Sequence, residues 1–206
     1  MRQSIIIVAL LALGCKNNFN AKWMQEKSPE TFQARFETTK GDFEVEFNRD
    51  LSPLAVDRVY QQLRHHFYDN VLFYRVVPNF VVQFGSMDST KTSHTWDQFK
   101  VKDEVVKGSN VKGAISYARS GPNTRGNHLF INLKDNTRLD TVSYNKVKGF
   151  PAFGKVTKGM EVVEQLYSGY GNETMKVYDS LATKRLEFIS RFPQLDAIKK
   201  AYIIKK

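Results

Sequence analysis

The stretch FYRVVPNFVVQFG, residues 73–85, does most to decide the fold of this chain. It predicts two apolar strands, 71–77 and 80–84, that meet at a hinge at Pro78-Asn79. Arg75 lies in the middle of this apolar pair, where burial of its charge is costly without a partner. Gln83 follows eight residues later, so strand alternation can place both side chains on one face. The stretch therefore predicts an Arg–Gln pair on one face of two apolar strands.

A second stretch, SYARSGPNTRGNHLFIN at residues 116–132, leads from a turn-rich loop into an apolar strand. Two glycines and a proline between Arg119 and Asn127 predict a loop, and residues 113–118 and 129–133 predict strands on either side of it. The glycines do not indicate a phosphate-binding loop, because they precede a strand and lack the Gly-Lys-Ser/Thr ending.

The rest of the sequence predicts short strands and two well-separated helices. Residues 36–47 alternate apolar and polar across a Lys40-Gly41 turn, which is typical of a hairpin. Ser52-Pro53 predicts a helix start with Ser52 as N-cap, and apolar residues recur at helical spacing as far as Phe67. Further expected elements are a polar loop at 86–102, a strand at 153–156, a helix at 160–167, a helical stretch at 175–192 and a closing strand at 197–204. Together they indicate a mainly β fold, a closed antiparallel barrel capped by two helices.

The two quoted stretches resemble the signature stretches of cyclophilins, roughly F-H-R-hydrophobic-hydrophobic-P-G-F-x-x-Q-G-G and S-M-A-x-x-G-P-x-T-x-G-S-Q-F-F-I. The resemblance continues at Leu139-Asp140, at FGKV in 153–156 and at GMEVV in 159–163, and it covers roughly residues 33–167. It implies an eight-stranded cyclophilin-like barrel and peptidyl-prolyl cis-trans isomerase (rotamase) activity that assists protein folding. Residues 175–192 are then expected to form a C-terminal helical extension.

The chemistry of an X-Pro bond explains why such a site needs a guanidinium. Isomerisation crosses a barrier of about 20 kcal/mol, and twisting the amide gives the prolyl nitrogen lone-pair character. A rigid, always charged donor aimed at that nitrogen binds the twisted state better than either planar state. No cofactor, metal or nucleophile is required.

The resemblance implies a role for each site residue. Arg75 is the catalytic guanidinium, Gln83 orders it and contacts the substrate backbone, and Phe80 belongs to both the catalytic set and the proline pocket. Ala118 and Arg119 are expected to supply backbone contacts, with His128 and Leu129 beside them. The remaining pocket residues are Val81, Phe130, Leu139 and Phe150.

Several positions depart from the family pattern. His128 stands where Gln is usual, Arg138 where an aromatic residue is usual, and Phe150 where many members have His or Tyr. These departures keep one alternative open, a catalytically weak chaperone or scaffold module that binds proline-containing segments. The positive charge of the chain leaves another, a structural envelope lipoprotein that holds an anionic polymer.

The first fifteen residues predict export and lipidation. Arg2 precedes an apolar run at 5–13 that is too short to span a bilayer and is typical of a signal peptide. Gly14-Cys15 resembles a bacterial lipobox, although Ala12 stands where Leu is usual; the alternatives are an ordinary signal peptide or a buried N-terminal strand. We expect residues 1–14 to be a signal peptide, 15–32 the lipidated cysteine and its tether, and 33–206 the isomerase domain. The expected location is the cell envelope, on the periplasmic or outer-surface side of a membrane.

Composition agrees with a globular domain and limits the partners. The chain has 206 residues, is 41% hydrophobic and carries a formal net charge of +10, but its basic residues are too dispersed to indicate nucleic-acid binding. The four histidines show no metal-ligand spacing. The partners we expect are proline-containing polypeptides and, through Cys15, a membrane, with the protein itself a monomer.

Overall fold

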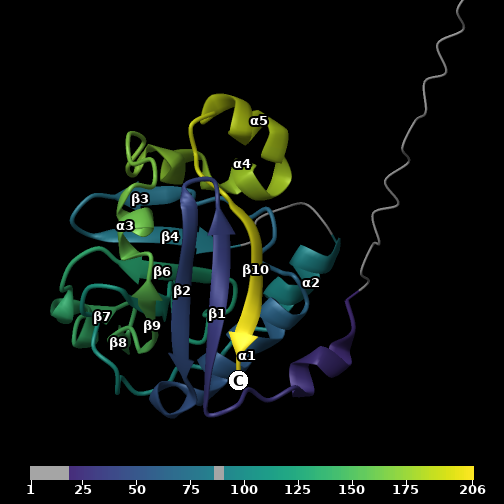
Figure 1. The fold of residues 1–206 in the computed structure, drawn as a ribbon, viewed down its shortest axis with the longest axis vertical. Helices are drawn as coiled ribbons and strands as arrows, with labels where there is room; N and C mark the ends of the chain where they lie inside the picture. Colours follow the sequence, from purple (N-terminus) through teal and green to yellow (C-terminus); the bar gives the residue numbers. More distant parts are fainter. Residues whose placement is uncertain (1–18, 86–90) are drawn as a thin grey trace, which may run out of the picture.

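The computed structural model describes residues 19–85 and 91–206. The predicted anchor at Cys15 lies outside these residues. Eight strands form one antiparallel sheet in the order β10-β1-β2-β9-β5-β6-β4-β3 (Figure 1). The strands are β1 (Thr31–Thr38), β2 (Gly41–Asn48), β3 (Arg75–Val77), β4 (Val81–Gly85), β5 (Ala114–Tyr117), β6 (His128–Asn132), β9 (Ala152–Lys158) and β10 (Ile198–Lys205). A separate two-stranded ribbon joins β7 (Ser143–Tyr144) to β8 (Val147–Lys148).

The predicted mainly β, eight-stranded antiparallel architecture is confirmed, but closure of the barrel is not. β3 and β10 are the two ends of the sheet and do not pair with each other. Only the residues before them meet, through a single bridge between Leu72 and Ala197. The expected strand at 71–77 is therefore shortened to three residues, because the backbone of Val71 and Phe73 bonds to residues 196–198 rather than to β4. The sheet is curled and open.

Strand alternation accounts for the core. Phe36 and Phe43 face each other across the β1–β2 hairpin with their rings 4.9 Å apart, and Gly41 supplies the positive φ of 127° that the turn requires. From strands farther along the sheet, β4 and β6, the side chains of Val82 and Leu129 point into the same core. The sheet thus wraps one apolar core.

Two helices cover this core as predicted. They are α1 (Pro53–Arg64) and α3 (Met160–Glu164), which ends earlier than the predicted residue 167. Ser52 occupies the N-cap position of α1, but its side chain makes no capping hydrogen bond to the helix. The Glu104 carboxylate instead accepts from the backbone N–H groups of Leu54 and Ala55, and also from the Ser52 hydroxyl. A carboxylate from a distant loop therefore caps α1.

The segment expected to be a polar loop contains α2 (Lys91–Gln98) and the wholly buried Trp96. Trp96 packs on Phe19, Trp23 and Phe67 at ring distances of 5.2, 6.0 and 5.6 Å. Trp23 belongs to the 3-10 helix η1 (Ala21–Gln25), within the expected tether. The folded domain therefore begins before the predicted residue 33.

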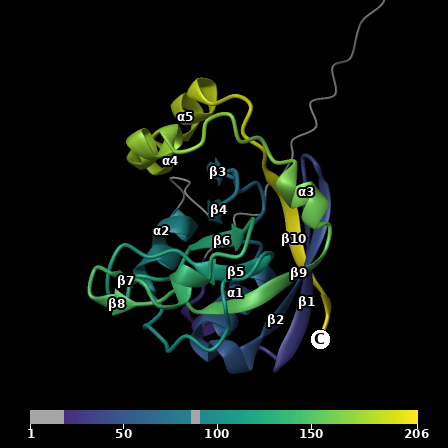
Figure 2. The same ribbon diagram turned by 90° about the vertical axis from the view of Figure 1, so that its left-hand side faces the viewer.

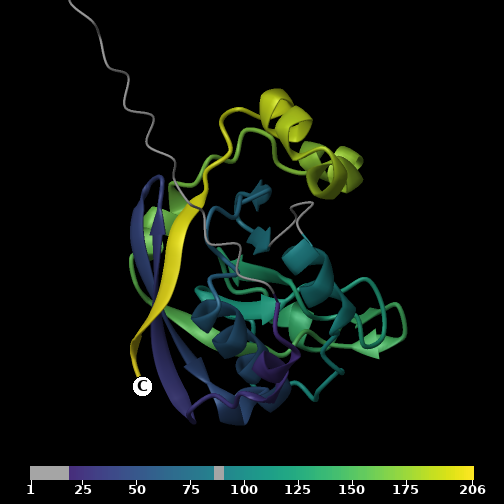
Figure 3. The same cartoon turned by 90° about the vertical axis from the view of Figure 1, so that its right-hand side faces the viewer.

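The helical stretch predicted as a C-terminal extension is not terminal, because β10 follows it; it lies between α3 and β10, in residues 165–197, which we call the insertion. It contains η4 (Glu173–Val177), α4 (Tyr178–Thr183) and α5 (Arg185–Arg191). Figures 2 and 3 show α4 and α5 at the end of the molecule beyond β3. Phe188 and Phe192 pack with Leu72 and Tyr74 in a second apolar cluster, so this insertion is fixed to the segment that leads into β3. Two further short 3-10 helices are η2 (Arg49–Leu51) and η3 (Thr137–Asp140).

Candidate active site

A row of side chains crosses the outer face of the sheet from β3 to β6. Arg75 pairs in register with Gln83, and Gln83 pairs with Phe130. Their strand neighbours Val76, Val82 and Ile131 point into the core instead. The predicted Arg–Gln pair therefore exists: Arg75 Nη1 donates to Gln83 Oε1 over 3.1 Å.

A small apolar cluster lies beside this row and apart from the main core. It contains the buried Val81, Phe130 and Leu139, with Phe80, Ala118 and Phe150 packed against them. We call these six residues the pocket cluster. The structure thus brings together Phe80, Val81, Phe130, Leu139 and Phe150, the five side chains assigned to the proline pocket and its edge.

Phe80 is held tightly at the end of the Pro78-Asn79 turn. Asn79 adopts a φ of 56°, and the Phe80 carbonyl accepts from the Leu133 N–H and from Asn136 Nδ2, both at 2.9 Å. The guanidinium carbons of Arg75 and Arg138 lie 5.7 and 5.6 Å from the centre of the Phe80 ring. The pocket cluster therefore begins directly beside the Arg75 guanidinium.

Arg75 has a second partner that its local sequence does not indicate. Its Nε donates to Asn172 Oδ1 over 2.7 Å, from the insertion. Burial lowers the pKa of Arg75 from its usual value, yet a guanidinium remains charged in proteins. Two acceptors thus orient one charged side chain, and within the described residues Nη2 has no acceptor.

Arg119 contributes its side chain as well as its backbone. Its guanidinium lies over the Phe150 ring, 4.0 Å from the ring centre, and Nη2 donates to the Val147 carbonyl over 3.1 Å. Nε and Nη1 are buried without a hydrogen-bond partner among the described residues. Arg119 therefore carries unused donors at the Phe150 end of the pocket cluster.

Of the three remaining predicted contact residues, Ala118 belongs to the pocket cluster, whereas Leu129 and His128 do not. Leu129 is wholly buried in the main core, because it alternates with Phe130, so its side chain cannot reach the pocket cluster. The backbone N–H of Ala118 donates to the His128 carbonyl over 2.9 Å. The His128 ring meets the hydroxyls of Tyr74 and Tyr178, at 3.3 Å and 3.1 Å, and burial lowers its pKa to about 4. His128 thus links β6 to the insertion.

The described residues contain no group of three His, Cys, Asp or Glu side chains that could hold a metal ion. The row and the pocket cluster instead combine one oriented guanidinium, one amide and an apolar surface. Such a set can hold a small apolar ring and direct a charged donor at its edge.

Comparisons with known proteins point in the same direction. Residues 33–185 match the family model described as cyclophilin type peptidyl-prolyl cis-trans isomerase/CLD. A peptidyl-prolyl cis-trans isomerase A of Dickeya dadantii is 32% identical over 171 residues, which cover 82% of this chain and 83% of that protein. Isomerase CYP18-2 of Arabidopsis thaliana is 36% identical over 141 residues, 66% of this chain and 80% of that protein.

Solved structures agree on the fold. A cyclophilin type isomerase of Cryptosporidium parvum superposes with a TM-score of 0.62 at 19% identity, and the match covers 85% of this chain and 99% of that one.

Proposed function

Since this chain belongs to the family of cyclophilin type peptidyl-prolyl cis-trans isomerases, we propose that the row of Arg75 and Gln83 with the pocket cluster is where it isomerises X-Pro bonds. The observation that carries this assignment is the placement of an oriented guanidinium beside a separate apolar cluster. A structural relative from Cryptosporidium parvum was crystallised in the presence of the dipeptide Ala-Pro, which supports a proline-containing substrate.

The geometry suggests a division of roles. The pocket cluster receives the proline ring, and Arg75 Nη2 donates toward the prolyl nitrogen as the amide twists. Gln83 and Asn172 position Arg75. One charge-assisted hydrogen bond supplies about 1.5–3 kcal/mol, so exclusion of water and fixing of the flanking peptide must supply the rest of the acceleration.

Arg75→Ala tests this assignment. We expect catalysed cis-to-trans relaxation of a short X-Pro peptide, followed by NMR exchange, to fall at least roughly 100-fold, as on loss of a preorganised charge-stabilising donor. Arg64→Ala, which removes an exposed arginine of α1, is the matched control and should keep wild-type turnover.

The same experiment separates catalysis from capture. A wild-type protein that binds the peptide without accelerating it would contradict the assignment and favour a proline-segment-binding chaperone or scaffold. Equal turnover by folded Arg75→Ala and wild type would show that chemistry occurs without this guanidinium.

We further propose that the substrates are exported proteins and that Cys15 anchors the enzyme to a membrane of the cell envelope. The support is the apolar run at 5–13 followed by Gly14-Cys15. Two acyl chains anchor stably, whereas one chain is marginal. Across residues 19–85 and 91–206, none of the helices has the length and apolar character to cross a bilayer.

A further inference from the structure

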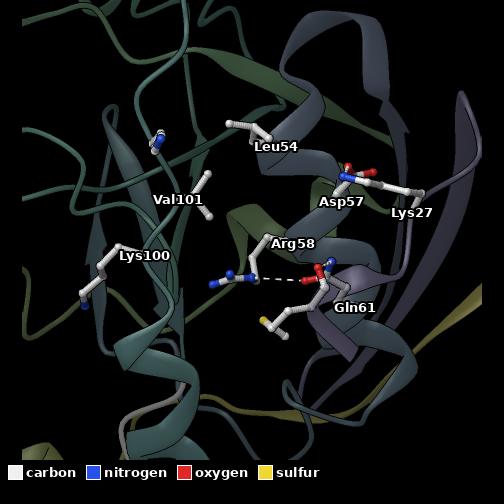
Figure 4. A pocket seen from close by; sticks show the side chains of 9 residues that line it. Lys27, Leu54, Asp57, Arg58, Gln61, Lys100 and Val101 are labelled. Carbon is white, nitrogen blue, oxygen red and sulfur yellow. Dashed lines mark hydrogen bonds and ion pairs between the residues drawn. The ribbon is translucent and has the colours of Figure 1, made fainter. Parts of the chain in front are cut away.

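A hollow lined by none of the residues around Arg75 lies between α1, the segment before β1 and the loop after α2 (Figure 4). Its volume is about 410 Å³. Its lining includes the side chains of Lys27, Arg58 and Lys100, and it shares no residue with the Arg75 row or the pocket cluster. We call it the basic pocket.

Arg58 is a built part of this pocket. It is only 8% exposed, its Nε donates to Gln61 Oε1 over 3.3 Å, and Nη1 donates to the Phe99 carbonyl. Its guanidinium carbon lies 5.7 Å from the centre of the Trp96 ring. Gln61 is fixed in turn, since its Nε2 donates to the carbonyls of Met24 and Glu26 at 3.2 and 2.8 Å.

The charge of Arg58 is not paired with a counterion in the part of the chain that the structure describes. Within the described residues no carboxylate forms an ion pair with it, and Nη2 has no acceptor. Figure 4 shows its guanidinium directed across the pocket toward Lys100. Burying an unpaired charge is costly, so a bound anion would satisfy a group that the fold alone leaves uncompensated.

The lining holds more basic than acidic side chains. Lys27, Lys100 and Lys102 join Arg58 in the lining, against the single carboxylate of Asp57. That carboxylate is saturated: it accepts from Arg49 Nε and Nη2 at 2.9 and 3.1 Å, from Lys27 Nζ at 3.0 Å and from the Ser28 N–H at 2.9 Å. Lys100 pairs with Asp97. No described carboxylate therefore remains to neutralise Arg58.

We propose that the basic pocket binds a phosphate-class oxyanion, with Arg58 Nη2 as its donor and Lys100 and Lys102 as further cations. A guanidinium suits this ligand, because its planar fork matches phosphate geometry. The apolar side chains of Met24, Leu54 and Val101 in the same lining fit an ester of phosphate that carries an apolar group. Two sources share this chemistry, a phospholipid headgroup and a soluble phosphate.

Titration of the purified protein with inorganic phosphate, at constant ionic strength against chloride, tests the pocket. We expect saturable NMR shifts at the amides of Gln61 and residues 100–102, with a Kd on the order of 1–10 mM for the bare ion. Arg58→Gln keeps a hydrogen-bonding side chain without the charge and should weaken binding roughly tenfold or more, an effect of ~1.4 kcal/mol. Isomerase turnover should be unchanged.

Because Arg58 is buried, the double variant Lys100→Ala/Lys102→Ala provides a test through exposed side chains. It should weaken phosphate binding several-fold, whereas Lys199→Ala, an exposed lysine of β10, should not. Absence of saturable shifts in wild type, or equal affinity in wild type and both pocket variants, overturns the proposal.

Vesicles distinguish the two sources. For the Cys15→Ser protein, which carries no acyl anchor, binding to phosphatidylcholine vesicles that contain phosphatidylglycerol, but not to phosphatidylcholine alone, identifies a headgroup if the added Arg58→Gln change loses it. Phosphate binding without any vesicle binding identifies a soluble phosphate. Vesicle binding that Arg58→Gln and Lys199→Ala reduce equally reports diffuse charge and counts against a built site.

Discussion

Two acceptors from distant parts of the chain hold the guanidinium of Arg75. Gln83 faces it across the β3–β4 pair, as strand alternation requires, whereas Asn172 comes from the insertion almost a hundred residues later. Together they occupy Nη1 and Nε and leave Nη2 for a substrate. Asn172 is therefore a positioning residue, since it acts on the reaction through Arg75.

Asn172→Ala should lower kcat more than it raises KM, because the proline pocket stays intact while Arg75 loses one of its two fixed directions. We expect a roughly five- to tenfold fall in kcat/KM for an X-Pro peptide, on the scale of part of one charge-assisted hydrogen bond. Asn172→Asp retains an acceptor at Oδ1 and should recover most of the activity.

Met175→Ala, an exposed residue of the same insertion, is the control and should behave as wild type. An Asp variant as impaired as the Ala variant would show that Asn172 serves the fold of the insertion rather than the orientation of Arg75.

At the level of elements, the insertion is attached through His128 at the start of β6. Its ring contacts Tyr178 of α4 and Tyr74 before β3. Burial is the largest cause that lowers the His128 pKa, to about 4 from 6.5; the nearby Asp97 carboxylate opposes this and Lys100 adds to it. The ring is therefore neutral in the folded protein at neutral pH.

This pKa predicts acid sensitivity. The unfolded chain binds the proton near pH 6.5 and the folded chain only near pH 4, so the free energy of unfolding falls as pH drops through this window. Between pH 7 and 5 the expected loss from this group is about 2 kcal/mol. The carboxylate of Asp57, whose pKa is lowered to about 2, loses its contribution only at more acidic pH.

Urea unfolding at pH 7 and pH 5 measures the effect. His128→Gln should reduce the pH-dependent loss, whereas His94→Gln, which alters an exposed histidine of α2, should leave it unchanged. Identical pH dependence in wild type and His128→Gln would place the linkage elsewhere.

The elements that the sequence predicted well are those whose pattern is local. Alternation across the Lys40-Gly41 turn predicted the β1–β2 hairpin, and apolar spacing predicted α1. α2 was missed because its eight residues carry a single large apolar side chain, the buried Trp96, whose ring partners lie in η1 and after α1. The start of β3 was also misplaced, at residue 71 instead of Arg75, because the backbone of Val71 and Phe73 bonds to residues 196–198.

The site residues also divide into those that a local sequence pattern predicts and those that depend on distant parts of the chain. The motifs around Arg75 and Phe130 placed the row and most of the pocket cluster, since those residues share one sheet face. The inward direction of Leu129 follows from strand alternation and could have been predicted. Asn172 and the Tyr178–His128 contact depend on how a long insertion folds back, and no local pattern encodes that.

At the scale of the whole molecule, the segment before β1 ties the chain that follows Cys15 to the core of the domain. Phe19, Trp23 and Met24 pack against the core, and Phe19 stands only four residues after Cys15 in the sequence. A span of four residues reaches at most about 14 Å. If Cys15 is acylated, the domain is held close to the membrane surface, and the net charge of +10 of the full sequence, to which the leader contributes only Arg2, favours an anionic leaflet.

Cys15→Ser tests this arrangement in a bacterial host. We expect the wild-type protein to incorporate a fatty-acid label and to sediment with membranes even in high salt, because acyl chains bind through the hydrophobic effect, which salt does not screen. The Ser variant should lose the label and leave the membrane fraction, with X-Pro turnover unchanged. Label-free wild-type protein that salt releases from membranes would instead show attachment by charge alone, and Cys15 would then be an unmodified residue of an ordinary leader.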